Sequence, residues 1–316
     1  MNKIFVTGGC GFVGSHLVEY LFKKYKKSEI IVYDKITYAA NLNNLKKIHK
    51  NKRLKIIIAD ILNYKKLIKL TKNVDLLIHA AAESHVDRSF ALNKNFIKTN
   101  VIGTRNIMEV AKINKIKKTI HISTDEVYGE IYQGKFKENS ILNPSNPYSS
   151  SKAAAEMIIN GYIHSYKLPV IIIRGNNIFG TRQHIEKLIP TSCFNIILGK
   201  KISIHGSGLQ KRSFIYVDDF CEAVNRIIKK GKLFNVYNIG TNFEYKNIEV
   251  VKIILDKFAL NLKSNVKYIK DRPFNDYRYS IDISKIKKLN WKPKNKLENK
   301  INLVIDWYKK NYKQYL

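Results

Sequence analysis

The chain has 316 residues, of which 45% are hydrophobic, and it contains only 15 Gly and 6 Pro. This composition suffices for one large globular domain or two that share a core, and it excludes low-complexity disorder. The formal net charge is +32, from 57 Lys and Arg against 25 Asp and Glu. Such an excess can indicate a polyanion partner, but the lysines are spread along the chain without a run of five. This distribution favours solvated faces, and we expect no nucleic-acid partner.

The three cysteines, Cys10, Cys193 and Cys221, form no CxxC pair. An odd number argues against a disulfide framework and fits a reducing, cytoplasmic setting. The chain enters an apolar strand at once, without the apolar core of a signal peptide, and no stretch of 18 apolar residues predicts a membrane span. No Cys/His spacing indicates a metal site. We therefore expect a cytoplasmic protein with no membrane or metal association.

A buried strand at Ile4–Thr7 is followed by a glycine-rich turn and a helix from about Ser15 to Lys24. The turn satisfies both G-x-G-x-x-G and G-x-x-G-x-x-G through Gly8, Gly9, Gly11 and Gly14. Glycines let the backbone turn tightly and approach a pyrophosphate, and the N-terminus of the helix then favours that anion. The alternative is an ordinary strand–helix turn. The strand before the pattern and the helix after it favour dinucleotide binding.

A second strand, Ile30–Tyr33, ends at Asp34, 20 residues after Gly14 (34 − 14). A carboxylate at this distance can bind both hydroxyls of an adenosine ribose. Further strands are predicted at Lys55–Ala59 and Val74–Ala80, with helical segments between them. The alternation of strands and helices predicts an α/β fold with a doubly wound, parallel, Rossmann-type sheet.

The segment Ala80–Ser89 changes from small residues to polar ones. Its small half would let a cofactor lie against the backbone, and its polar half would hold a substrate. A lone histidine such as His85 in this segment is more often structural than catalytic. A helix that contains Thr99 and runs to about Ala111 then leads to the next strand.

That strand, Lys118–Ser123, ends in Thr124, Asp125 and Glu126, so two adjacent carboxylates reach its carboxyl end. In an open α/β sheet, ligands bind outside the carboxyl ends of the strands. Simple oxidation or reduction needs no carboxylate at this place. The triplet therefore indicates an acid and a base at a ligand site.

Tyr148 and Lys152 lie four residues apart in a helix that Pro147 begins, so they share one helix face. A Lys ammonium beside a Tyr hydroxyl lowers the pKa of the phenol, which becomes a base near neutral pH. The alternative is an exposed Tyr–Lys pair without function, since this spacing is common by chance. The dinucleotide motif and the acidic strand end favour a catalytic pair.

A further strand is predicted at Val170–Arg174 and another at Val236–Gly240. Elsewhere beyond Gly175 the pattern loosens, and we expect short or irregular elements. This half of the chain supplies cations and amides. It suits a lid that grips an anionic substrate, with Arg212 and Arg272 as forks for phosphate.

Eight stretches between about Lys3 and Trp307 together resemble one family, the nucleotide-sugar 4,6-dehydratases of the extended short-chain dehydrogenase/reductase superfamily. They are Thr7–Gly14, Ala81–Ser89, Ser123–Gly129, Asn146–Lys152, Arg174–Asn177, Glu186–Pro190, Tyr237–Gly240 and Asp271–Pro273. The Asp-Glu pair after Thr124 is the most specific mark, because the related 4-epimerases usually carry small residues there.

Some positions depart from the bacterial dTDP-glucose enzymes. Cys10 replaces a usual alanine, and Arg212-Ser213-Phe214 stands where those enzymes have Arg-Asp-Trp. The stretches Gly175–Ile178 and Asp271–Asp276 look more like the UDP-glucose dehydratases of eukaryotic rhamnose synthesis. The resemblance therefore leaves UDP and dTDP open as the nucleotide.

The resemblance implies an NAD-dependent lyase that converts UDP-glucose or dTDP-glucose to an NDP-4-keto-6-deoxyglucose for rhamnose or deoxysugar synthesis. It assigns catalysis to Thr124, Asp125, Glu126, Tyr148 and Lys152. For NAD it implies Gly8, Gly11, Phe12, Val13, Gly14, Asp34, Lys35, Asp60, Ile61, Ala80, Ala82, Thr99, Tyr148 and Lys152. For the sugar nucleotide it implies Ser84, Thr124, Asn177, Lys187, Leu188, Arg212, Asn247 and Arg272.

In the implied mechanism, Tyr148 takes the proton of the sugar 4-hydroxyl, Thr124 hydrogen-bonds that oxygen, and hydride passes from C4 to NAD⁺. Glu126 then removes the C5 proton, Asp125 protonates the departing 6-hydroxyl, and the hydride returns to C6. We expect an NAD-binding Rossmann domain over residues 1–175, with a return segment near 213–241. Residues 176–316 would form mainly a smaller α/β domain that binds the sugar nucleotide.

Family members are usually homodimers that pack the helices of Thr99 and Tyr148 into a bundle, and the resemblance implies the same here. Two alternatives stay open. One is an NDP-sugar 4-epimerase or reductase on the same scaffold, which a product spectrum distinguishes. The other is a basic nucleic-acid-binding protein with an inactive dehydrogenase fold, which would show steeply salt-dependent binding to DNA.

Overall fold

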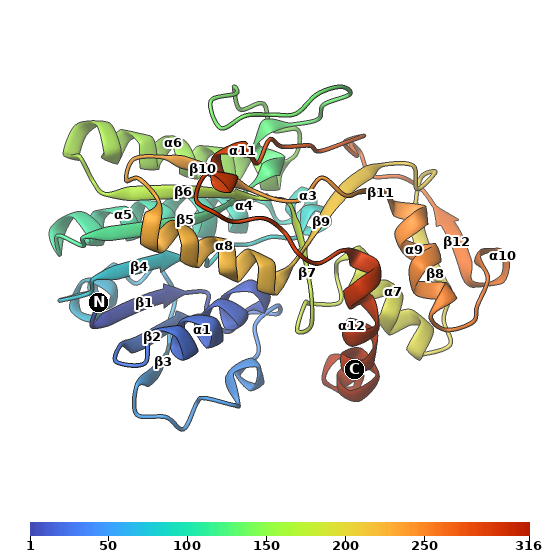
Figure 1. Ribbon diagram of the computed structural model, residues 1–316, viewed down its shortest axis with the longest axis horizontal. Coiled ribbons are helices and arrows are strands. Elements are labelled where there is room, and N and C mark those ends of the chain that lie inside the picture. The colour runs from blue at the N-terminus through green and yellow to red at the C-terminus, as the bar shows by residue number, and fades with distance from the viewer.

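The computed structural model describes residues 1–316 and is built around one seven-stranded sheet (Figure 1). Its order is β10-β6-β5-β4-β1-β2-β3, and all neighbouring strands are parallel. The strands are β1 (Lys3–Thr7), β2 (Glu29–Asp34), β3 (Leu54–Ile58), β4 (Leu76–His79), β5 (Lys118–Thr124), β6 (Val170–Gly175) and β10 (Val236–Ile239). The order reverses between β1 and β4, which places a ligand crevice outside their carboxyl ends. The predicted doubly wound, parallel sheet is confirmed.

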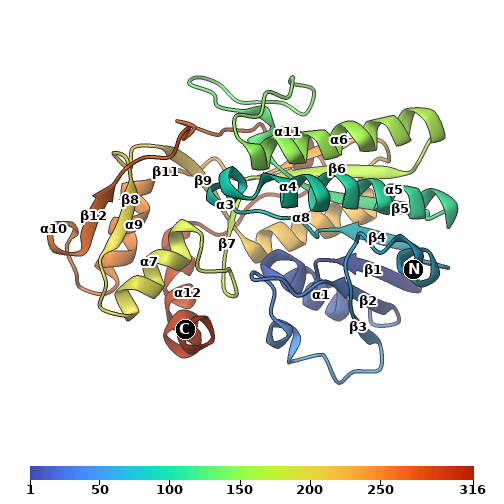
Figure 2. The ribbon, with the colours of Figure 1, turned by 180° about the vertical axis from the view of Figure 1, so that it is seen from behind.

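Helices cover both faces of this sheet (Figures 1 and 2). One face carries α1 (Phe12–Lys24) and α8 (Val217–Lys230), and the other carries α2 (Tyr64–Leu70), α5 (Gly103–Ile113) and α6 (Pro147–Tyr166). Strand β1 shows the cause, because Ile4 and Val6 join the core of the first face and Phe5 joins that of the second. Successive side chains of a strand alternate between faces, so a sheet covered on both sides needs continuous apolar strands.

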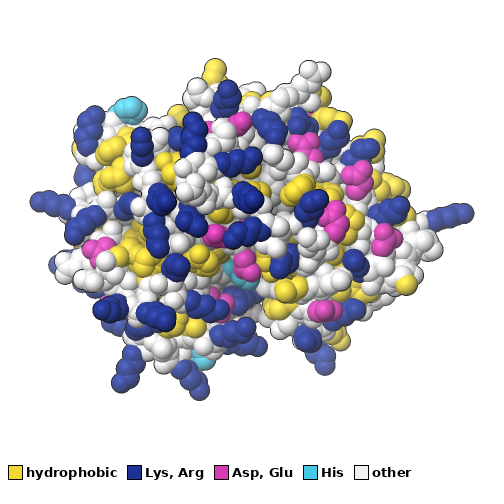
Figure 3. Space-filling view, in the orientation of Figure 1, with side chains coloured by type: hydrophobic (Ala, Val, Ile, Leu, Met, Phe, Trp, Pro, Cys, Tyr) yellow, Lys and Arg dark blue, Asp and Glu magenta, His cyan; other side chains and the backbone are white.

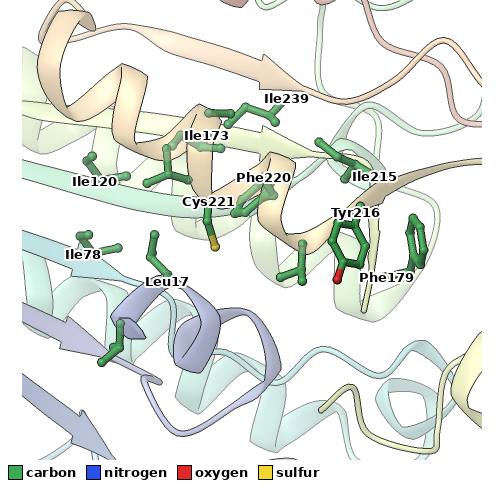
Figure 4. Packing of buried hydrophobic residues seen from close by; sticks show 14 of the residues in the cluster. Leu17, Ile78, Ile120, Ile173, Phe179, Ile215, Tyr216, Phe220, Cys221 and Ile239 are labelled. Atoms are coloured by element: carbon green, nitrogen blue, oxygen red, sulfur yellow. The ribbon is translucent and has the colours of Figure 1, made fainter. Parts of the chain in front are cut away.

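The larger of the two cores lies between the sheet and helices α1 and α8. Figure 4 shows Leu17 of α1 and Phe220 of α8 packed with Ile78, Ile120 and Ile173 of the central strands. All five side chains are at most 1% exposed. Helices α1 and α8 are far apart in the sequence, so this core joins distant segments of the chain into one domain.

Most of the remaining elements lie beyond the carboxyl ends of the main strands, whereas α11 (Ser284–Lys287) packs beside β10 (Figure 1). A three-stranded sheet contains β7 (Asn177–Phe179), β9 (Lys211–Tyr216) and β11 (Glu244–Lys246), and a two-stranded sheet contains β8 (Ile202–His205) and β12 (Val266–Ile269). The helices are α7 (Leu188–Ile197), α9 (Asn247–Asp256), α10 (Leu262–Asn265), α11 (Ser284–Lys287) and α12 (Leu297–Asn311).

The expectation of short or irregular elements after Gly175 was wrong in part. Helices α7 and α9 have 10 residues each, α8 has 14 and α12 has 15. In α12 the buried side chains recur at helical spacing, at Leu297, Ile301, Val304, Ile305 and Tyr308. The lysines and asparagines between them hide this stripe in the sequence, and the stripe faces a core that only the folded chain forms.

Two helix boundaries also differ from the predictions. Helix α1 begins at Phe12 and not near Ser15, because Gly11 itself is the N-cap residue. The helix predicted around Thr99 is a continuous run of α4 (Asn93–Phe96), the π-helical segment η2 (Ile97–Ile102) and α5. A π-helical segment inside a helix often accompanies a functional site.

The positive charge is distributed over the surface. Figure 3 shows Lys and Arg side chains scattered over one whole face of the molecule, with Asp, Glu and apolar side chains between them. This arrangement agrees with solvated lysines and gives no contiguous basic stripe on that face. No helix has both the length and the apolar character needed to cross a lipid bilayer.

Candidate active site

A cavity of about 520 Å³ opens at the carboxyl ends of the central strands. Its wall contains residues from the glycine-rich turn, from β5 and α6, and from the elements beyond Gly175. Every predicted site residue lies in this wall except Asp125, which is buried directly behind it between Thr124 and Glu126. The fold thus brings together residues that are more than 250 positions apart, such as Gly8 and Arg272.

The glycine-rich turn forms one end of the cavity. No side chain caps the N-terminus of α1, so the first N–H groups of that helix are left for a ligand. A Cβ on Gly8 would lie 2.6 Å from the Ala81 nitrogen, and one on Gly14 would lie 2.0 Å from the Gly8 oxygen. A Cβ on Gly11 would meet only the Gly8 oxygen, at an ordinary 3.5 Å. Packing therefore does not require glycine at Gly11, whereas an anion lying close to the backbone does.

Asp34 ends β2 beside this turn and holds it in place. Its carboxylate accepts hydrogen bonds from the backbone N–H groups of Cys10 and Ile36, each at 2.8 Å. Burial raises the pKa of Asp34, and these hydrogen bonds oppose that rise. Lys35 pairs with Asp60 at 2.8 Å, so its charge is already engaged at the cavity wall. The carboxylate of Asp34 is thus fixed where a ribose would be recognised.

The end of β5 turns into a short 3₁₀ helix, η3 (Asp125–Tyr128), which the Thr124 side chain caps. The Thr124 hydroxyl accepts from the Glu126 N–H at 3.2 Å and donates to Asp125 Oδ1 at 3.4 Å. This local geometry follows from the sequence, because Thr is a favourable N-cap residue after an extended strand. It holds the hydroxyl and both carboxyl groups within one turn.

Both carboxyl groups have a raised pKa. Burial, and then the neighbouring charge of Glu126, raise the pKa of Asp125 to about 7. Burial also raises the pKa of Glu126, while the nearby cations Lys187 and Arg212 oppose the rise. Asn176 donates to Asp125 Oδ2 at 2.6 Å, so Oδ1 has only the longer contact with the Thr124 hydroxyl. Two carboxyl groups that titrate toward neutral pH are suited to proton transfer.

The predicted effect of Lys152 on Tyr148 is wrong for this structure. Burial raises the pKa of Tyr148, Glu126 and Asp125 raise it further, and only a hydrogen bond with Thr124 lowers it. The ammonium of Lys152 donates to the Ile122 oxygen at 2.7 Å instead. Four-residue spacing places two side chains on one face of α6 but does not decide where a flexible lysine directs its charge.

The predicted phosphate-binding cations lie at the opposite side of the cavity, and each has a partner within the chain. Arg272 Nε is 2.6 Å from an Asp87 oxygen. Lys187 donates to the Ser84 oxygen at 2.7 Å. Arg212, which is 8% exposed, donates to the backbone oxygen of Asp276 at 2.8 Å. These contacts hold the cationic groups at the wall, where an anionic ligand would meet them.

Comparison with known proteins identifies the family. The family model for GDP-mannose 4,6-dehydratase matches residues 5–304. The human dTDP-D-glucose 4,6-dehydratase is 40% identical over 318 residues, which cover 98% of this chain and 91% of that protein. The chain belongs to the nucleotide-sugar 4,6-dehydratase family. The family predicted from the motifs is therefore confirmed.

Solved structures of this family and its relatives have the same fold. The dTDP-glucose 4,6-dehydratase of Streptomyces venezuelae, determined with NAD bound, is 36% identical, has a TM-score of 0.96, and aligns over 99% of this chain and 98% of that one. The UDP-glucose 4-epimerase of Thermotoga maritima aligns over 98% of this chain and 99% of that one, with a TM-score of 0.90 and 26% identity. The fold alone therefore does not distinguish a dehydratase from an epimerase.

The sequence analysis did not identify two residues that line this cavity, Asp276 and Tyr279. Tyr279 donates to Asp276 Oδ2, and the Ser145 hydroxyl lies 2.7 Å from both oxygens of that carboxylate. The Arg212 guanidinium lies 4.3 Å from the centre of the Tyr279 ring. In the sequence, only the polar and aromatic composition after Asp271 indicated a binding surface there, and it did not single out either residue.

Asn100 in η2 is a further residue whose role the sequence did not indicate. Its side chain exchanges two hydrogen bonds with the Glu83 backbone, at 2.9 and 3.0 Å, and donates to Ser151 at 2.8 Å. It thereby joins the segment after β4 to α6, beside Tyr148. No group of three or more His, Cys, Asp or Glu side chains is arranged to hold a metal ion.

Proposed function

We propose that acid–base groups at the end of β5 and the start of α6 carry out the reaction of this chain, the conversion of an NDP-glucose to an NDP-4-keto-6-deoxyglucose. The chain is an NAD-dependent hydro-lyase. One observation carries the assignment: Tyr148 and Lys152 share a cavity with Glu126, and Asp125 lies directly behind it. Oxidation and reduction alone require no such carboxyl pair.

The residues at the glycine-rich end fit a dinucleotide. We propose that Gly11 and the first turn of α1 hold the pyrophosphate, and that Asp34 binds the ribose of the adenosine. Bound at these residues, NAD would supply the hydride acceptor for C4 of the sugar and, once reduced, the hydride donor for C6, and its oxidised form would add a positive charge to the cavity. Residues 1–175 with the segment 213–241 would form the cofactor domain, and residues 176–316 mainly the substrate domain.

The first proton transfer is assigned to Tyr148. Its phenolate takes the proton of the sugar 4-hydroxyl, and the Thr124 hydroxyl hydrogen-bonds the same oxygen. Because burial raises the pKa of Tyr148, the phenolate needs a cation nearby to form at neutral pH. Lys152 lies one turn away on the same face of α6. Its ammonium donates to the Ile122 oxygen in this structure, and we propose that it turns toward Tyr148 to supply this charge.

Elimination is assigned to the two carboxyl groups. The 4-keto group makes the C5 proton acidic, and Glu126 removes it. Asp125 gives a proton to the departing 6-hydroxyl through Oδ1, since Asn176 holds Oδ2. A pKa of about 7 leaves a large part of Asp125 protonated at neutral pH, as a general acid requires. Glu126 returns its proton to C5 when hydride reaches C6. The proton that Tyr148 took from the 4-hydroxyl replaces the one that Asp125 gave to the departing hydroxyl, so the net change is loss of one water.

Lys187, Arg212 and Arg272 are proposed to bind the diphosphate of UDP-glucose or dTDP-glucose. The human relative is named for dTDP-D-glucose, and an Arabidopsis relative that is 39% identical is named for UDP-glucose. That plant protein is longer, and this chain covers 47% of it. Both nucleotides therefore belong in the test of substrate.

A homodimer is proposed through the face formed by η2, α5 and α6. Four large apolar side chains there are 47–52% exposed: Ile97, Ile102, Ile113 and Met157. Apolar side chains gathered on two neighbouring helices are typical of an interface. Size-exclusion chromatography with light scattering tests the dimer. We further propose a cytoplasmic location, which three free, buried cysteines fit.

The decisive experiment is incubation of the protein with UDP-glucose and dTDP-glucose in parallel, followed by mass analysis of the products. Loss of one water without net consumption of NAD is the expected result for at least one substrate. A product of unchanged mass would identify an epimerase, and stoichiometric NADH a dehydrogenase. Either of these outcomes would overturn the proposal.

A further inference from the structure

A buried ion pair between Glu156 and Arg174 lies behind the catalytic groups. Arg174 Nη2 is 2.6 Å from Glu156 Oε2, and Arg174 Nε donates to both carboxylate oxygens at 3.2 and 3.0 Å. Glu156 is 0% exposed and Arg174 is 4% exposed. Burying two charges has a large desolvation cost, and such pairs can often be replaced by apolar residues without loss of stability. A contribution to the stability of the fold is therefore a weak explanation for the presence of this ion pair.

The pair holds the catalytic segment from both sides. The Ser123 hydroxyl, directly before the triplet, donates to Glu156 Oε1 at 2.5 Å. Arg174 Nη1 donates to the hydroxyl of Tyr128, two residues after the triplet, at 2.7 Å. The Tyr128 hydroxyl in turn donates to Asn238 of β10 at 2.8 Å. The turn that carries Asp125 and Glu126 is thus fixed at each end by one ion pair.

The same pair holds the helix that carries the base. Glu156 follows Lys152 by four residues on α6, and Lys152 follows Tyr148 by four, so the three side chains lie along one face. Arg174 belongs to β6, the neighbour of β5 in the sheet. A single contact therefore links α6, β5 and β6 where the acid–base groups meet.

We propose that Glu156 and Arg174 are positioning residues that keep the carboxyl pair in register with Tyr148 and Lys152, and that the charge of Glu156 keeps Lys152 protonated. This inference rests on the role proposed above for Lys152. It adds a charge relationship along α6 that the catalytic residues themselves do not contain.

The surroundings of Lys152 agree with this electrostatic role. The titratable groups that act on its ammonium are His79 of β4, His121 of β5 and Glu156 of α6, with Arg174 of β6 paired to Glu156. Burial and the charge of Lys152 lower the pKa of both histidines, so they are neutral near pH 7. Burial lowers the pKa of Lys152 to about 8, and Glu156 opposes that change. Among these groups, Glu156 supplies the negative charge.

Three variants separate the electrostatic role from a structural one. Glu156→Gln keeps size and removes the negative charge, and Arg174→Met removes the positive charge and leaves Glu156. The double variant removes both charges, so no buried charge stays unpaired, and it carries the test where a single variant fails to fold. For each folded variant, the rate of NADH formation in a single turnover with an NDP-glucose is measured against pH.

The alkaline limb of this profile is expected to follow the protonation of Lys152. For Glu156→Gln it should lie about one pH unit below that of the wild type, since an opposite charge nearby is lost. The alkaline limb of the double variant should lie at a pH between those of Glu156→Gln and the wild type. The limb of Arg174→Met should lie at the pH of the wild-type limb or above it. A lower rate with the same limb in every folded variant would overturn the inference and leave a structural pair. A wild type that oxidises neither UDP-glucose nor dTDP-glucose would instead refute the proposed function, and this inference with it.

Discussion

Asp125→Asn is expected to stabilise the fold at alkaline pH while it removes activity. The pKa of this carboxyl rises from 3.8 to about 7 in the folded chain, a difference of about 3 units (7 − 3.8). At about 1.36 kcal/mol per unit, ionised Asp125 lowers the free energy of unfolding by on the order of 4 kcal/mol. Since the folded pKa lies above the unfolded one, this cost is absent below the unfolded pKa. It grows as the pH rises and is complete above the folded pKa.

Asparagine keeps the shape of Asp125 and an oxygen that can accept from Asn176, but it carries no charge. Denaturant unfolding of wild type and variant at pH 5.5 and pH 8.5 measures the effect. The stability gained by the variant should increase by about 2 kcal/mol between these two pH values. Product formation should fall by about 10²–10⁴-fold, because the general acid is missing.

A matched control is Asp219→Asn. That carboxylate is also buried, at 3% exposure, but it accepts hydrogen bonds from the Lys294 and Asn295 N–H groups at 2.9 and 2.8 Å. Its replacement should destabilise the fold, because charge-assisted hydrogen bonds are lost. An equal gain for Asp125→Asn at both pH values, or a loss at pH 8.5, would show that the ionised carboxylate carries no such cost.

Three further outcomes are expected. Tyr148→Phe should slow NADH formation in a single turnover by about 10²–10⁴-fold, since no base accepts the 4-hydroxyl proton; a near-normal rate contradicts the assignment. Glu126→Gln should oxidise the sugar without dehydrating it, so enzyme-bound NADH and a 4-keto glucose accumulate while product falls by about 10²–10⁴-fold. Wild-type formation of 4-keto-6-deoxy product by this variant would mean that another group is the base. NADP should bind more weakly than NAD, because a 2′-phosphate beside Asp34 costs on the order of 1–4 kcal/mol at effective dielectrics of 20–80. Equal affinities in equilibrium titrations would exclude Asp34 from this role.

The sequence alone was sufficient wherever the chemistry is local. Gly8 and Gly11 lie in the turn before α1 and Gly14 in the first turn of that helix, Asp34 ends the next strand, and Thr124 caps the turn with the two carboxyl groups. Each pattern depends on the backbone conformation of a few adjacent residues, so spacing along the chain predicts it. The parallel sheet follows from the same kind of signal, the alternation of apolar strands and helices.

The tertiary structure decided what depends on distant partners. The contact of Asp276 with Ser145 joins residues 131 positions apart, and no local pattern predicts it. The long helices after Gly175 bury stripes that are interrupted by lysines, and they become recognisable only against the core they face. The ion pair of Glu156 with Arg174 likewise requires β6 to lie beside α6.

The acid–base properties of the site were also decided by the tertiary structure. Tyr148 and Lys152 were found by their spacing, but the direction of the Tyr148 pKa shift was predicted wrongly, because it depends on burial and on the carboxyl groups of another segment. For Asp125, the sequence supplied the carboxyl group and the fold supplied the desolvation that raises its pKa to about 7. A residue type specifies which proton can be exchanged, whereas the low-dielectric surroundings assembled by the whole chain determine at which pH.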